Sequence, residues 1–222
     1  MGAPNASLVF ATRPGGTTLD RDAEGGNPFA TALIRAARSE AAPMATLLPQ
    51  VRAMTATGSN GHQDPIWVLR AAERAWRLGL PAGERRVALM LVVSDYTLGL
   101  RQTLAGAAHD ERRVAALFAE YGFSVQQGIA PDRRALCEAL RRFATQARTA
   151  DAALIYSTGH GVSHDGQDYL LPAGYPFTSR DTPASLKRHA IGVHRLAGAC
   201  QARRANLVFF AACRSALGDA PR

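Results

Sequence analysis

Two reactive side chains each come a few residues after a predicted apolar strand. His160 comes after a strand expected over Ala152–Tyr156, and Cys213 comes after a strand expected over Asn206–Phe210. In open α/β sheets, functional residues gather beyond the carboxyl ends of the strands. If both strands lie parallel in one sheet, the imidazole and the thiol leave it at the same edge. A cysteine nucleophile and its base need that arrangement.

Each of these residues also has a purely structural interpretation. His160 is flanked by glycines and could cap a turn. Cys213 could be a small buried apolar residue, like Cys137 and Cys200, which both fall on the apolar faces of predicted helices. Cys213 differs from them because it follows a strand and precedes Arg214, in a polar setting typical of a turn.

A regular alternation of strands and helices is expected to position the two residues. Such alternation, with short connections, predicts an α/β fold with a mostly parallel sheet covered by helices on both faces. The expected strands are Ser7–Ala11, Ile66–Leu69, Val87–Val93, Phe123–Gln127, Ala152–Tyr156 and Asn206–Phe210. The expected helices begin at Pro28 and near Thr46, and cover Asp110–Tyr121, Asp132–Arg148 and Ile191–Ala202.

The composition is that of a globular chain: 222 residues, 47% hydrophobic and 20% charged. This excludes disordered, collagen-like and disulfide-scaffold classes. The longest apolar run, Val87–Val93, is far shorter than the roughly 20 residues that cross a bilayer. The chain carries three cysteines and no export signal, so we expect free thiols, a cytoplasmic location and no membrane association.

The net charge of +8 raises the question of nucleic-acid binding. Of the 26 basic residues only Lys187 is a lysine. The arginines are interleaved with acids, as in Glu111-Arg112-Arg113, which is typical of a solvated surface. A nucleic-acid partner would favour arginines gathered on one face and a steep salt dependence. We therefore expect no nucleic-acid partner.

Several segments, in order, resemble the large-subunit half of the caspase and metacaspase superfamily. The 53 residues from His160 to Cys213 are close to the roughly 50 in the caspase signature. Any single match would be weak, and the order gives the resemblance its weight. The matching segments are Val87–Tyr96, Leu104–Asp110, Gly122–Val125, Tyr156–Gly161 with Tyr169–Pro172, and Leu207–Arg214.

The small-subunit half of that family normally follows the cysteine in the sequence. Here the segments that resemble it lie at the N-terminal end of the chain. Leu8–Gly15, Asn27–Leu33 and Asp64–Val68 are similar to its opening strand, helix and final strand. The resemblance thus implies one circularly permuted caspase-like domain over 1–222, with three layers. Residues 1–69 form the small-subunit-like half, 70–86 a linker and 87–222 the large-subunit-like half. The 17-residue linker can span roughly 56 Å, far more than the expected radius of gyration of about 17 Å.

The resemblance implies a cysteine endopeptidase. Cys213 would attack the peptide carbonyl, His160 would serve as base and acid, and the backbone N–H groups of Gly161 and Cys213 would form the oxyanion hole. The new termini fall in the segment that many caspases cut on activation, which implies activity without that cut. Ala211 and Ser215 depart from the family's usual cysteine block, so a catalytically silent scaffold or regulatory module is the alternative.

The resemblance also bears on substrate choice. The arginines that hold a P1 aspartate in caspases fall at Leu104 and Asp20, and the neighbouring glutamine falls at Ala211. Metacaspases cut after Arg or Lys and use acids here, one of which corresponds to Asp110. We therefore expect peptide or protein substrates with a basic P1 residue. Asp110 could instead be a helix-capping acid, and Asp20 a solvated loop acid.

No cofactor and no metal are expected, and a monomer is favoured. Metacaspases often need calcium, but Asp165, Asp168 and Asp181 are scattered, whereas Ca²⁺ takes six to eight oxygens. A zinc site of His160, His164 and Cys213 lacks a fourth ligand. We therefore expect activity in the presence of a chelator.

Overall fold

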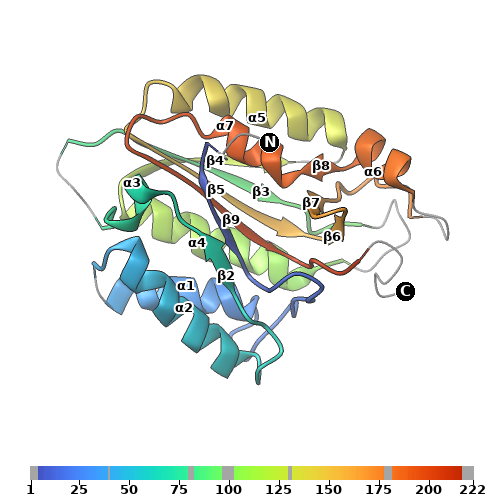
Figure 1. The fold of residues 1–222 in the computed structure, drawn as a ribbon, viewed down its shortest axis with the longest axis horizontal. Helices are drawn as coiled ribbons and strands as arrows, with labels where there is room; N and C mark the ends of the chain where they lie inside the picture. The colour runs from blue at the N-terminus through green and yellow to red at the C-terminus, as the bar shows by residue number, and fades with distance from the viewer. Residues whose placement is uncertain are drawn as a thin grey trace.

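The computed structural model describes residues 5–39, 41–79, 83–96, 103–129, 132–177 and 182–216 (Figure 1). A six-stranded sheet in the order β2-β1-β9-β5-β3-β4 forms its centre. All neighbouring pairs are parallel except β1 and β2, which are antiparallel. The predicted α/β class with a mostly parallel sheet is confirmed. Its strands are β1 (Ser7–Phe10), β2 (Ile66–Val68), β3 (Arg86–Val92), β4 (Phe123–Ile129), β5 (Ala152–Gly159) and β9 (Ala205–Ala212).

Helices cover both faces of this sheet, as Figure 1 shows. Side chains of β3 alternate between two cores: Ala88 and Met90 join the cluster under α1, α2 and α4, whereas Leu89 and Leu91 join the cluster under α5 and α7. This is why the strand reads as an unbroken apolar run. The covering helices are α1 (Pro28–Ser39), α2 (Met44–Gly58) and α4 (Ala105–Glu120) on one face, and α5 (Arg133–Ala147) and α7 (Val193–Ala199) on the other.

The N-terminal segment belongs to the same sheet as the rest of the chain. Strand β1 pairs in parallel with β9, with Val9 opposite Phe209. The expected linker over 70–86 contains regular secondary structure. It contains the short helix α3 (Ala71–Arg74), whose fully buried Glu73 accepts hydrogen bonds from the Ser7 hydroxyl and from the backbone N–H of Asn206. Residues 80–82 of this connection lie outside the described part.

A second, three-stranded sheet was not predicted. It consists of β6 (Gly161–His164), β7 (Gln167–Leu170) and β8 (Ile191–Gly192), paired antiparallel. Asp165 and Gly166 join β6 to β7 with φ of 50° and 68°, the left-handed conformation that an Asp-Gly hairpin turn requires. Strand β8 takes the first two residues of the helix expected over Ile191–Ala202. The short helix α6 (Pro183–His189) precedes it.

Helix α4 begins at Ala105, five residues before the predicted start at Asp110. Its first free N–H groups are satisfied from a distant loop, since the Asp20 carboxylate accepts from the backbone N–H of Gly106 (3.1 Å) and of Ala107 (3.3 Å). No helix among the described residues is both long and apolar enough to cross a membrane.

Candidate active site

The two reactive residues follow the ends of neighbouring strands. Gly159, the last residue of β5, lies opposite Ala212, the last residue of β9, in a parallel pairing. His160 and Cys213 are the next residue of each strand, so they leave the sheet side by side. The backbone carbonyl of His160 accepts a hydrogen bond from Leu171 N–H (2.9 Å), which ties it to the chain after β7.

Gly161 lies against the cysteine segment too closely for any side chain. A Cβ atom there would lie 2.5 Å from the Cys213 carbonyl oxygen and 2.9 Å from the Ala212 Cβ atom. Two residues further along each segment, Ser163 N–H donates a hydrogen bond to the Ser215 carbonyl (2.8 Å). Glycine at 161 therefore allows β6 to pack directly on the chain that carries the thiol.

Tyr96 contacts both the backbone and the ring of His160. The sequence did not identify it as a residue of the site. Its hydroxyl accepts from the His160 backbone N–H (2.7 Å) and donates to the Leu171 carbonyl (2.8 Å). The two rings lie 4.4 Å apart between centroids. Burial raises the pKa of Tyr96 well above its ordinary value, and the opposing hydrogen bond from His160 is smaller in effect. The phenol therefore stays protonated and keeps both hydrogen bonds.

The Cys213 sulfur touches a loop from the far end of the sequence. Thr18 N–H donates to Sγ at 3.3 Å, and the Thr18 hydroxyl oxygen lies 3.5 Å from Sγ. Among the other thiols, Cys200 is fully buried, and burial raises its pKa strongly. Cys137 packs against the core under α5 but stays partly exposed, so it is less buried than its predicted place on the apolar face of a helix implied. Within the described part of the chain, Cys213 is the one cysteine that is partly exposed and also accepts a hydrogen bond from a backbone N–H group on its sulfur.

A buried ion pair fixes the residue after the thiol. Arg214 binds Asp168 of β7 through two hydrogen bonds, Nε to Oδ1 at 3.0 Å and Nη2 to Oδ2 at 2.9 Å. Its third nitrogen donates to the Thr12 carbonyl (3.3 Å), and the guanidinium lies 3.9 Å from the centre of the Phe10 ring. The pair joins β7 and the end of β1 to the cysteine segment.

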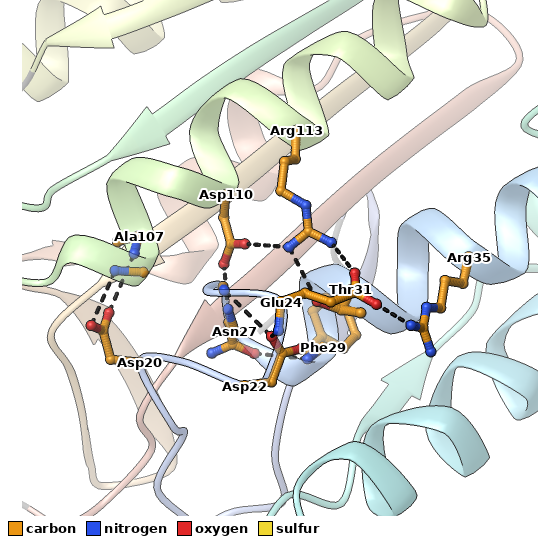
Figure 2. A network of polar contacts seen from close by, with 12 residues as sticks. Asp20, Asp22, Glu24, Asn27, Phe29, Thr31, Arg35, Ala107, Asp110 and Arg113 are labelled. Atoms are coloured by element: carbon orange, nitrogen blue, oxygen red, sulfur yellow. Dashed lines mark hydrogen bonds and ion pairs between the residues drawn. The ribbon is translucent and has the colours of Figure 1, made fainter.

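The predicted substrate residues lie in different surroundings. Asp20 caps α4, and its side chain is 30% exposed, so it is not simply a solvated loop acid. Asp110 is fully buried in α4 and accepts from Asn27 N–H (2.9 Å), beside Arg113 (Figure 2). Ala211 is buried in β9 within the core under α1, α2 and α4. Leu104 immediately precedes α4 and is partly buried.

Asp110 makes stability depend on pH. Burial raises its pKa to about 7, against the opposing effects of the Asn27 N–H and Arg113; Asp22 and Asp20 raise it further. The native chain therefore holds this proton up to higher pH than the unfolded chain, in which the pKa is about 4. The free energy of unfolding should fall by roughly 2–4 kcal/mol as pH rises from 4 to 7.

Urea unfolding of the wild type and Asp110→Asn between pH 4 and 8 measures this effect. The asparagine does not titrate, so the difference between the two unfolding free energies should change with pH over that interval. Parallel pH curves for the two proteins would contradict the prediction.

The residues weighed as metal ligands lie apart in the structure. His164 is the last residue of β6, an extended strand that follows His160, and four residues in such a strand span about 13 Å. Asp168 is taken by Arg214, and Asp165 lies beside His164 (3.2 Å). The third acid weighed for calcium, Asp181, lies outside the described residues. Within the described residues no three His, Cys, Asp or Glu side chains gather as a metal site requires.

One comparison with known proteins identifies the family of the chain. Residues 85–221 match the family model of the caspase domain. The match covers more than half of the chain and includes β3 to β9, His160 and Cys213. A search of curated proteins finds no match.

Proposed function

Because the chain belongs to the caspase family of cysteine peptidases, we propose that it is an endopeptidase with Cys213 as nucleophile and His160 as general base and acid. One observation carries this proposal: the two residues follow strand ends that lie opposite each other, Gly159 and Ala212. Cys213 is partly exposed, whereas Cys200 is fully buried, which supports Cys213 as the nucleophile.

The reaction is acyl transfer in two stages. The Cys213 thiolate attacks the carbonyl carbon and a C–S bond forms, after His160 has taken the thiol proton. The C–N bond then breaks, and His160 gives its proton to the leaving amine. In the second stage His160 takes a proton from water, the hydroxide attacks the thioester, and the C–S bond breaks. The carboxylic product leaves and the thiol is restored.

The backbone N–H groups of Gly161 and Cys213 are proposed to stabilise the oxyanion. Backbone donors of this kind are worth several kcal/mol when they are aimed at the developing charge. The close packing of Gly161 on the Cys213 carbonyl supports the proposal, because it fixes one segment against the other.

We propose cleavage after Arg or Lys. Asp20 supports this preference, since its partly exposed carboxylate is two residues from Thr18, which contacts the sulfur. Asp110 is fully buried in α4. Of the two acids only Asp20 is partly exposed, and its carboxylate, which also caps α4, is proposed to bind the basic P1 side chain.

A peptide panel differing only at P1 tests the specificity. Cleavage after Arg or Lys should exceed cleavage after Asp by at least about 100-fold, since a desolvated opposite charge is worth several kcal/mol. Asp20→Asn should reduce this preference about tenfold, and Asp22→Asn serves as the matched control. Equal or faster cleavage after Asp would refute the proposal.

We also propose that the uncut chain is active and that no calcium ion is required. The engagement of Asp168 with Arg214 supports the second point. Hydrolysis by protein shown by intact mass to be uncleaved should proceed at the same rate in EGTA. Loss of activity in EGTA that calcium restores would overturn the proposal that no calcium is required. Activity that appears only after cleavage would overturn the proposal that the uncut chain is active.

A further inference from the structure

Two buried side-chain amides hold the chain next to the Cys213 sulfur. Gln63 lies between α2 and β2 and is fully buried, and its Oε1 accepts from Leu19 N–H at 3.0 Å. Asn27, which is 4% exposed, donates from Nδ2 to the Leu19 carbonyl at 2.8 Å. Together the two amides bind both polar groups of the Leu19 backbone.

The amides also bind each other. Gln63 Nε2 donates to Asn27 Oδ1 (3.2 Å) and to the Ala11 carbonyl (3.3 Å), and Asn27 Oδ1 also accepts from Phe29 N–H (2.8 Å). The surroundings of residue 63 therefore require a side chain with one acceptor, here Oε1, and one group that donates two hydrogen bonds, here Nε2. A carboxylate would place an acceptor against two acceptors, and an apolar side chain would leave buried groups unsatisfied.

The pair is anchored on the opposite side as well. Asn27 N–H donates to the buried Asp110 of α4 at 2.9 Å, and Figure 2 shows this hydrogen bond together with the one that Asn27 Oδ1 accepts from Phe29 N–H. The loop that leaves β1 is therefore fixed at Leu19 relative to both α1 and α4. Thr18, whose N–H points at the sulfur, is the neighbour of that fixed residue.

We propose that Gln63 is a positioning residue for the thiol: with Asn27, it holds the segment 17–20 so that the Thr18 N–H points at the Cys213 sulfur. A hydrogen bond from an N–H group favours the charged form of its acceptor, here the thiolate. The Gln63–Asn27 pair therefore keeps this donor in place beside the sulfur. The inference rests on the proposed function only in taking this sulfur as the nucleophile.

The test is the pH profile of Cys213 alkylation by iodoacetamide, followed by intact mass in a Cys137→Ala background. The variants are Gln63→Met, which keeps the side-chain length, and Asn27→Ser, which keeps a helix N-cap but loses the donor to Leu19. Gln201→Met, on the surface, is the matched control. The plateau rate reports access to the sulfur, and the midpoint reports stabilisation of the thiolate.

Other titratable or charged groups near the sulfur or on the segment stay unchanged in both variants. They are His160, Tyr96, Asp20, His62, which contacts the Thr17 hydroxyl, and Arg214 paired with Asp168. Asp110, which accepts from Asn27 N–H and whose pKa is raised to about 7 by burial, is also unchanged in both variants and in the control.

We expect the midpoint to move to higher pH by at least about half a unit in both variants and to stay in place in Gln201→Met. We also expect hydrolysis at neutral pH to fall at least about fivefold. An unchanged midpoint in a variant that keeps Cys200 unlabelled would overturn the inference. If Gln63→Met unfolds and exposes Cys200, the midpoint measured for Asn27→Ser decides whether the inference holds. Absence of hydrolysis in the wild type would remove the proposed function, while the alkylation profile would still decide the inference.

Discussion

Replacing Cys213 with alanine is expected to abolish peptide hydrolysis, with a fall in kcat on the order of 10³-fold or more. Without the sulfur no thioester can form, and the remaining groups can only bind and polarise the substrate. The fold should be unaffected, because Cys213 is partly exposed beyond the end of β9 and belongs to none of the apolar clusters formed by the described residues. Initial rates on an arginyl peptide measure the change.

His160→Ala should lower kcat by about 10²- to 10⁴-fold, the usual contribution of a general acid–base. Two matched variants accompany these tests. Cys137→Ala removes a partly exposed thiol on α5, and His164→Ala removes a partly exposed imidazole four residues further along. Both should retain near-normal rates, and a large loss in either would contradict the assignment.

The second large effect concerns stability and comes from the buried ion pair beside the thiol. Asp168→Ala should lower the free energy of unfolding by about 3–5 kcal/mol, because it leaves the Arg214 guanidinium buried and uncompensated. The two side chains are only 9% and 8% exposed, so water cannot replace the lost carboxylate. Urea denaturation followed by circular dichroism measures the loss.

Two comparisons isolate the cause. The double variant Asp168→Leu with Arg214→Met removes both charges and should be clearly more stable than Asp168→Ala. Glu138→Ala breaks the exposed pair with Arg134 and should cost less than about 1 kcal/mol. Equal losses in the Asp168 and Glu138 variants would show that the buried pair contributes no more than a surface one.

Much of the fold could be predicted because the apolar pattern that indicates each strand or helix lies within that segment of the sequence. The unbroken apolar run of β3 indicated a strand covered on both faces, and the structure divides its side chains between two cores. The β6–β7 hairpin also had a local signal, the Asp165-Gly166 pair, which sequence analysis left unused. The start of α4 had none, because its cap is Asp20, far away in the chain.

The candidate site was predictable only where it follows strand ends. The positions of His160 and Cys213 depend on both strands lying parallel in one sheet, which the alternation of elements predicts. That β5 and β9 are direct neighbours was not predicted. The contacts of Thr18, Gln63 and Tyr96 depend instead on where loops cross after folding, which single-sequence patterns do not encode. The burial of Asp110 likewise results from packing of the loop before α1 onto α4.

The most direct test of the account is covalent labelling by a peptidyl-arginyl ketone, located by peptide mass mapping. We predict one adduct, on Cys213, formed with saturation kinetics in the wild type and at least about 100-fold more slowly in His160→Ala. Folded protein that forms no adduct, or that is labelled on Cys137, would contradict the account. The silent-scaffold alternative would then be the better description of the chain.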